Sequence, residues 1–388
     1  MRSSARRTGA AHLALAVLAL WAIGTPDGLF AEAGSGEETY EWNLPPGVPA
    51  PRLPPDAVMT EATVELGRHL FYDMRLSGNG TQSCASCHVQ ELAFTDGRAR
   101  GLGSTGEQHA RSPMSLVNVA YRDALTWANP TLRTLEKHVL VPMLGIHPVE
   151  LGMAGHEERI YSTLAADPMY QALFANAFPG AAHHVNREQI VIALAAFQRS
   201  IVSFDSPFDR YRFYGDTTAL DPSARRGMQL FFSSRTNCGG CHMAHNVPHL
   251  GINLDGGSKH SASRDDESEV FLFHNTGLYA LDEPFSYPED NLGLYEHTGI
   301  LRDIGKFRIP TLRNIAVTAP YMHDGSIATL DEVLDHYIAG GRAPNSQQSE
   351  FLVPLELSAR DRDDLIAFLH SLTDEKLLAD PRWSDPWR

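Results

Sequence analysis

Cys84-Ala-Ser-Cys87-His88 and Cys238-Gly-Gly-Cys241-His242 are the two stretches that decide how this chain of 388 residues folds. Each has the Cys-x-x-Cys-His spacing by which c-type haem is attached to proteins. The two thiols form thioethers with the porphyrin, and the histidine that follows is placed to bind the iron. These four cysteines are the only ones in the chain. The alternative, a pair of redox or zinc half-sites, does not explain a histidine directly after each pair. We therefore predict two covalently bound haem c groups.

The N-terminus has the pattern of an export signal. Three arginines within the first seven residues precede an apolar stretch at 11–24, and Ala31-Glu32-Ala33 offers a small-x-small cleavage site. The apolar stretch is short for a membrane span, although an uncleaved anchor is the alternative. We predict a signal peptide over residues 1–33, a periplasmic location and no stable membrane insertion after cleavage. Export agrees with c-type haem, because bacteria attach this haem outside the cytoplasm.

The composition constrains the partners of the protein. The formal net charge is −15, and no basic cluster offsets it. Such a surface repels nucleic acid, so we exclude nucleic acid as a partner. A basic patch on a partner protein is compatible with this charge.

The rest of the sequence predicts a mainly α-helical protein in which one cytochrome c-like unit occurs twice. After an extended arm at 34–57, which is rich in proline and glycine, we expect domains at 58–205 and 206–388. In each domain a helix ending in Leu-Phe-aromatic precedes the haem motif, and an amphipathic helix closes the domain. The closing helices are expected at 187–202 and 359–372. Ser358 and Asp361 mark the start of the second closing helix as an N-cap and its partner.

The segment at 243–310 shows little periodicity. We expect loops that cover the haem there, with a short hairpin.

Several segments resemble the superfamily of bacterial dihaem cytochrome c peroxidases and MauG. They include LGRHLFYDMRLSGNGTQSCASCH at 66–88 and KFRIPTLRNIAVTAPYMHDGSIATLDEVLDHYIAGG at 306–341. SPMSLVNVAY at 112–121 and the stretch that begins LTWANP at 125 are more narrowly similar to the MbnH branch. That resemblance implies a reaction in which hydrogen peroxide takes two haems to a high-valent bis-haem state. The enzyme would then oxidise tryptophan in a secreted MbnP-like partner to kynurenine.

The sixth ligand of the second haem distinguishes members of this superfamily. Besides His242, the sequence offers Met322 and Tyr337. A thioether raises the potential of haem iron, whereas phenolate stabilises oxidised iron. The peroxidases have their ligand methionine where this chain has Tyr337, and MauG has tyrosine there. The resemblance therefore favours Tyr337, with Met322 as the alternative.

The resemblance also implies a set of residues around the first haem, whose proximal ligand would be His88. Glu150 stands where the family has a distal acid, which can move a proton between the two peroxide oxygens. His274 resembles a second distal histidine of MauG. His138 replaces a distal glutamine, and His109 lies near the displaceable ligand of the peroxidases, with a poor match in spacing. Each of these histidines could instead have a structural role.

Two further features come from the resemblance. Trp127 matches a tryptophan between the two haems, where an indole lets both irons share one oxidised state. The amide oxygen of Asn118 and the backbone carbonyls of Thr318 and Pro320 resemble a calcium site between the domains, and oxygen donors suit calcium. The chain departs from MauG at 234–236, where Ser-Arg-Thr replaces a tryptophan that relays oxidising equivalents to the substrate.

We therefore predict a peroxidase-type oxidoreductase of the MauG and MbnH kind. The first alternative is a dihaem cytochrome c peroxidase that takes electrons from a small cytochrome. The second is an electron carrier without substrate chemistry, which would need no distal acid such as Glu150.

Overall fold

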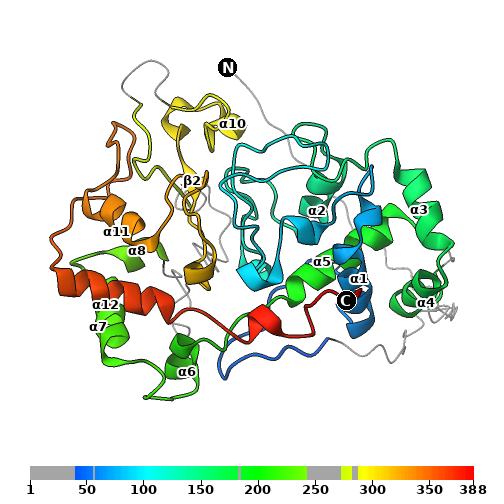
Figure 1. Cartoon of the computed structure of the whole chain (residues 1–388), viewed down its shortest axis with the longest axis horizontal. Coiled ribbons are helices and arrows are strands. Elements are labelled where there is room, and N and C mark those ends of the chain that lie inside the picture. Colours follow the sequence, from blue (N-terminus) through cyan, green and yellow to red (C-terminus); the bar gives the residue numbers. More distant parts are fainter. Residues whose placement is uncertain (1–39, 56, 182–184, 243–271, 282–286) are drawn as a thin grey trace, which may run out of the picture. The chain divides into compact units, whose positions relative to one another are not determined.

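The structure is a computed structural model that describes residues 40–55, 57–181, 185–242, 272–281 and 287–388, all within one compact unit, Glu38–Arg388 (Figure 1). As predicted, the described chain is mainly helical, with long connecting segments. The α-helices are α1 (Glu61–Tyr72), α2 (Leu135–Leu144), α3 (Glu157–Ala165), α4 (Pro168–Ala177), α5 (Arg187–Ser200), α6 (Pro207–Phe213), α7 (Pro222–Phe231), α8 (Cys238–His242), α10 (Tyr295–Thr298), α11 (Leu330–Ile338) and α12 (Ala359–His370).

Short 3₁₀ turns and one strand pair complete the described elements. The turns are η1 (Met74–Leu76), η2 (Cys84–Ser86), η3 (Gln90–Leu92), η4 (Val119–Tyr121), η5 (Leu301–Asp303), η6 (Ile315–Val317) and η7 (Leu377–Ala379). Strands β1 (Phe273–His274) and β2 (Phe307–Arg308) pair antiparallel. Where a short hairpin is expected, the described strands form a two-residue pairing between segments that lie far apart in sequence. Residues 243–271, which belong to the same expected loop region, lie outside the described residues.

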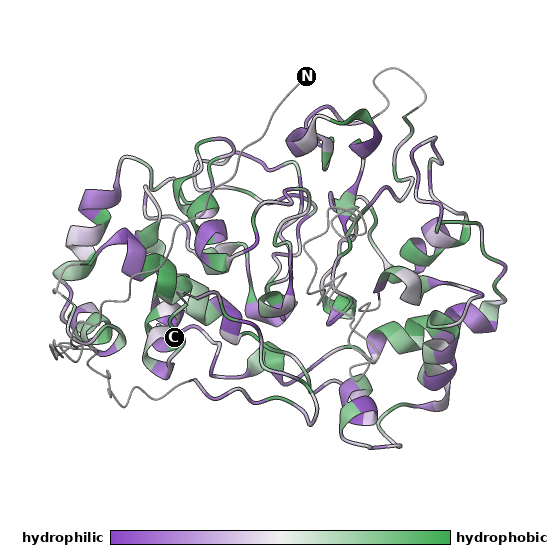
Figure 2. Cartoon of the chain, turned by 180° about the vertical axis from the view of Figure 1, so that it is seen from behind, coloured by the Kyte–Doolittle hydropathy of each residue, from purple (hydrophilic) through white to green (hydrophobic). Residues whose placement is uncertain are grey.

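The first helix pair is α1 against α5. Thr60 caps α1 by accepting a hydrogen bond from the backbone N–H of Thr63 at 3.1 Å. The buried face of α1 includes Leu70 and Phe71, and the Phe71 ring packs 4.9 Å from that of Phe197 on α5. Figure 2 shows both hydrophobic and hydrophilic residues on these helices, as expected where one face is buried.

The second pair, α7 against α12, repeats this arrangement (Figure 1). Phe231 on α7 packs 5.3 Å from Phe368 on α12. The predicted cap of α12 is confirmed, because Ser358 accepts from the backbone N–H of Asp361 at 3.2 Å and Asp361 accepts from the backbone N–H of Ser358 at 2.9 Å. The helix ends at His370, two residues before the predicted end.

Two asparagines, each between the two helices of its pair in sequence, also correspond. Asn118 and Asn314 both adopt left-handed backbone conformations, with φ of 54° and 59°. The Asn118 backbone N–H donates to Ile201 after α5 at 2.9 Å, and the Asn314 backbone N–H donates to Leu372 after α12 at 3.0 Å. Both side chains reach Ser203, whose N–H donates to the Asn118 amide oxygen at 2.7 Å and whose hydroxyl accepts from Asn314 at 3.2 Å. The segment after α5 is thus bonded to both halves of the chain.

Two hydrophobic cores surround these helix pairs. The first core includes Leu70, Phe71 and Phe197, and the second includes Phe231 and Phe368. The described part of the predicted arm lies without helix or strand against the first core, through side chains that include Tyr40 and Trp42. The predicted boundary at 205/206 stays a prediction.

The C-terminal segment crosses from the second core back to the first. Leu377 and Trp383 are buried in the first core, although they follow α12 in sequence. The Trp383 indole N–H donates to the Ser200 carbonyl at 3.2 Å, and the Tyr72 hydroxyl donates to the Trp383 carbonyl at 2.6 Å. Local sequence patterns do not indicate this crossing, and the predicted domain at 206–388 stays a prediction.

Candidate haem-binding sites

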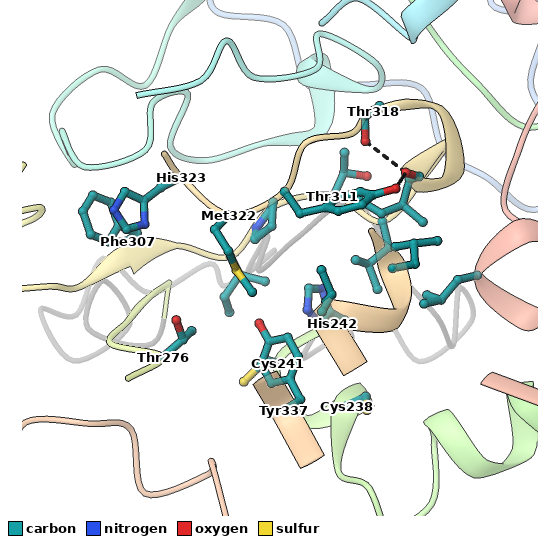
Figure 3. A pocket seen from close by; sticks show the side chains of 18 of the residues that line it. Cys238, Cys241, His242, Thr276, Phe307, Thr311, Thr318, Met322, His323 and Tyr337 are labelled. Carbon is teal, nitrogen blue, oxygen red and sulfur yellow. Dashed lines mark hydrogen bonds between the residues drawn. The ribbon is translucent and has the colours of Figure 1, made fainter. Parts of the chain in front are cut away.

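The second Cys-x-x-Cys-His motif opens onto a large cavity. Helix α8 is a single turn, so Cys238 and Cys241 lie on one face with His242 beside them. The cavity measures about 2020 Å³ when the open solvent at its mouth is included. It is lined by the motif, β1, β2, the segment at 309–323, α11 and α12, and also by residues 95–98 and 112–115. Figure 3 shows His242, Met322 and Tyr337 in this cavity. A space of this size and apolar character suits a porphyrin.

Tyr337 contributes a phenol to the cavity from α11. Burial raises its pKa well above the ordinary value, and the charges of Cys241 and Cys238 raise it further. The residue is partly buried, and its side chain lines the cavity beside His242. Met322 lines the same cavity and holds a strained backbone conformation, with φ of 71°. The structure therefore brings both predicted ligand candidates to His242.

His274 also lies at the second motif. It lines the cavity with His242, and its Nδ1 lies 3.1 Å from the Ser349 hydroxyl. Burial lowers the pKa of His242 to about 4, and the charge of His274 lowers it further. The cavity is also lined by residues 95–98 and 112–115 of the first half of the chain, so the predicted distal role of His274 stays a prediction.

The first motif has a histidine with a defined orientation. Turn η2 brings Cys84 and Cys87 together, and the His88 backbone N–H donates to the Cys84 carbonyl at 3.1 Å. His88 Nδ1 lies 2.8 Å from the Phe94 carbonyl, which can only accept, so Nδ1 carries the proton. Nε2 then keeps its lone pair. A histidine that binds metal through one ring nitrogen commonly donates its other ring N–H to a carbonyl in this way, which fixes the orientation of the ring.

Glu150 lies close to the first motif. Burial raises the pKa of Cys84 to about 12 and that of Cys87 to about 11, and the Glu150 charge raises both further. Burial also raises the pKa of Glu150 itself to about 7. Its backbone is fixed by the Ser104 N–H, which donates to the Glu150 carbonyl at 2.7 Å.

His138 lies near the same motif, on α2. Burial lowers its pKa to about 4, and the charges of His88 and Arg308 lower it further. Its Nδ1 is buried without a hydrogen-bond partner among the described residues. The imidazole is therefore neutral at neutral pH and available to a ligand. His109 is partly exposed, and its described contacts do not include His88.

Trp127 lies on the wall of the cavity at the second motif. Its indole N–H donates to the Ser112 carbonyl at 2.9 Å, and its own carbonyl accepts from the Arg308 backbone N–H at 2.8 Å. The ring packs edge-on against His323 at 6.4 Å, and His323 stacks on Phe307 at 3.5 Å. The indole is thus held by one hydrogen bond and one ring contact.

The residues predicted to bind calcium have other contacts. The Asn118 amide oxygen accepts from the Ser203 N–H, which leaves one lone pair. Thr318 and Pro320 line the large cavity, and the Thr318 hydroxyl donates to the Ile315 carbonyl at 3.2 Å. Among the described residues no hydrogen bond joins Asn118 to either of them, and no cluster of three or more His, Cys, Asp or Glu could hold a metal ion.

Two buried residues of the cavity wall were missed by the sequence analysis. Arg308 is 3 % exposed and His323 is 6 % exposed. Neither residue could be recognised from its neighbours in sequence. The burial of Arg308 and the ring contacts of His323 both depend on segments that are distant in the chain. For the haem motifs themselves, the paired thiols, the oriented ring of His88 and the phenol of Tyr337 in the cavity of His242 fit covalent haem c.

Comparisons with known proteins agree with this chemistry. The family model described as di-haem cytochrome c peroxidase matches residues 61–218. The cytochrome-c peroxidase IdrP1 of Denitromonas iodatirespirans is 35 % identical over 96 % of this chain and 95 % of its own length. The methylamine utilization protein MauG of Methylorubrum extorquens is 34 % identical over 85 % of this chain and 83 % of its own. The crystal structure of a MauG-like protein associated with microbial copper homeostasis is 44 % identical, with a TM-score of 0.82 over 90 % of this chain and all of the other.

Proposed function

We propose that this chain, which belongs to the family of dihaem cytochrome c peroxidases and MauG, uses hydrogen peroxide to oxidise tryptophan on a partner protein. Family membership makes it a peroxidase-type oxidoreductase. This argues against the alternative that the chain is an electron carrier without substrate chemistry. What distinguishes the two enzymatic alternatives is where the oxidising equivalents go. MauG-like enzymes deliver them to a protein, whereas cytochrome c peroxidases receive electrons from a small cytochrome.

The observation that carries the proposal is the Tyr337 phenol in the cavity of His242. A phenol that lines the cavity of His242 is suited to bind iron, and phenolate favours oxidised iron. A second iron that is easily oxidised would serve to hold an oxidising equivalent, whereas a methionine-ligated iron would serve to accept an electron from a donor. The similarity to the crystal structure of a MauG-like protein also supports the MauG-like reaction over the cytochrome c peroxidase reaction.

Bound haem would supply the capacity to take up oxidising equivalents from peroxide. Glu150 is suited to take a proton from peroxide and return it to the leaving oxygen, because its pKa of about 7 leaves both protonation states populated near neutral pH. The neutral imidazole of His138 could hydrogen-bond peroxide at the same motif. Trp127, held between Ser112 and Arg308, would connect the two haem sites.

We also propose that the chain contains two cytochrome c-like haem domains related by duplication. The support is the repetition of α1–α5 in α7–α12, with Phe71 and Phe231 in equivalent packing positions. Calcium bound by Asn118, Thr318 and Pro320 stays part of the proposal, and removal of calcium with a chelator tests it. The proposed location is the periplasm, after cleavage of the segment at 1–33. No described helix combines the length and the apolar character needed to span a membrane.

The experiment that tests the function supplies peroxide together with an MbnP-like secreted protein. We expect mass spectrometry to find the change that converts a partner tryptophan to kynurenine, and slow turnover with reduced small cytochromes. Trp127→Phe should weaken the near-infrared absorption that charge sharing between two haems produces, while both haems remain bound. Rapid peroxide reduction by a cytochrome donor, without any modified tryptophan, would support the alternative named by the relatives at 35 % identity.

A further inference from the structure

Arg308 on β2 is a buried cation without a counter-anion among the described residues. It is 3 % exposed. Its guanidinium donates to the Thr126 carbonyl at 3.1 Å, the Ile309 carbonyl at 3.1 Å and the Met114 sulfur at 3.3 Å. These partners are neutral. A guanidinium has five N–H donors, so two are left after these three contacts.

The electrostatic surroundings make this arrangement costly. Burial lowers the pKa of Arg308 well below its ordinary value, and the charge of Arg122 lowers it further. Arginine nevertheless stays protonated in proteins. Buried arginine is rarely found without an anionic partner, because removing a lone charge from water is unfavourable. By contrast, Arg313 on the same cavity wall is paired with Asp209 at 2.8 Å.

The position of Arg308 indicates which anion is missing. The side chain lines the cavity that also holds Cys238, Cys241 and His242, and it lies within electrostatic range of His138 near the first motif. A haem attached to these cysteines brings two propionate carboxylates into the same space. Planar bidentate pairing with a carboxylate is the interaction for which guanidinium is best suited.

We propose that Arg308 binds a propionate of the haem attached at Cys238 and Cys241. The inference rests on haem attachment at that motif, and it adds a cofactor-binding residue to the site. It also gives the arginine a positioning role. The guanidinium holds the Thr126 carbonyl, and the Arg308 backbone N–H holds the Trp127 carbonyl. A propionate on Arg308 would therefore be linked to the loop that carries Trp127.

The test uses Arg308→Gln in the full-length protein, with Arg302→Gln as the matched control. Arg302 is exposed, lies six residues before Arg308 and undergoes the same change in charge. Loss of a buried positive charge beside the haem favours ferric iron. We expect the ferric-to-ferrous ratio of the second haem at fixed electrode potential to rise at least tenfold, which is about 59 mV for one electron. The control should change by less than twofold.

A second measurement separates propionate binding from a general effect of charge. Redox-difference infrared spectra of protein whose haem propionates carry ¹³C should show a carboxylate band that shifts in Arg308→Lys, which keeps the charge but loses the planar fork. This variant also serves if Arg308→Gln does not fold. An unshifted propionate band would overturn the proposal, because the Arg308 guanidinium would then make no contact with a propionate.

The same measurements identify the haem. A change in potential confined to the first haem would overturn the assignment to the second. Haem content is determined separately, so absence of covalent haem at Cys238 and Cys241 in the unmodified protein would show that the proposed cofactor, rather than the role of Arg308, is wrong.

Discussion

Gly67 on α1 packs directly against the Ala193 carbonyl on α5, so that a methyl group on Gly67 would lie 1.9 Å from that oxygen. The equivalent contact recurs in the second half of the chain, where a methyl group on Gly227 would lie 1.8 Å from the Asp364 carbonyl. Each glycine precedes a haem motif by one helical turn and a loop. The close approach lets Phe71 and Phe231 reach the histidines of these motifs, with ring separations of 6.5 Å and 6.2 Å.

We expect Gly67→Ala and Gly227→Ala to destabilise the protein by about 1–3 kcal/mol or more, since overpacking forces the helices apart. The gain in helix propensity, about 1 kcal/mol, offsets only part of this cost. Thermal unfolding followed at the Soret band measures the effect. The two variants serve as controls for each other, because each should perturb the spectrum of its own haem motif. Unchanged unfolding of both would contradict the close packing.

Tyr337→Phe should abolish or strongly shift the low-spin ferric signal of the second haem, because it removes the phenol oxygen and little else. Met322→Leu should leave this signal largely intact. Electron paramagnetic resonance of the oxidised protein distinguishes the two, with one high-spin and one low-spin iron expected in the unmodified chain. The opposite pattern would assign the ligand to Met322 and favour the cytochrome c peroxidase reaction.

Local patterns were sufficient to predict several parts of this protein. The capping residues Ser358 and Asp361 lie three positions apart and fix the start of α12 by local hydrogen bonds. The mainly helical fold follows from comparable periodic segments. The return of Trp383 to the first core could not be predicted in this way, because its partner Ser200 is 183 residues away. The position of His274 beside His242 could not be predicted for the same reason, since β1 pairs with a strand that lies more than thirty residues further along the chain.

Arg313→Met should cost about 3–5 kcal/mol of stability, because it leaves the Asp209 carboxylate buried without its partner. The guanidinium lies 2.8 Å and 2.9 Å from the two Asp209 oxygens and stacks over Phe204 at 4.5 Å. Arg362→Met removes an exposed pair with Asp335 and should cost at most about 1 kcal/mol. Denaturant unfolding of both variants provides the comparison. Equal costs would show that burial does not govern the contribution of the Arg313 pair.

Glu150→Gln should slow the reaction with hydrogen peroxide about 100-fold or more, the lower range for general acid–base catalysis, with both haems still bound. The carboxylate form is the one that accepts a proton from peroxide. Because burial raises the pKa of Glu150 to about 7, the fraction of this form, and hence the rate, should rise with pH through that value and level off above it. Glutamine cannot titrate, so the rise should disappear in the variant. Stopped-flow kinetics between pH 5 and pH 9 measure both effects, with Glu158→Gln, at an exposed position on α3, as the control. Peroxide kinetics that are unchanged in rate and pH profile would exclude Glu150 from the proton transfer.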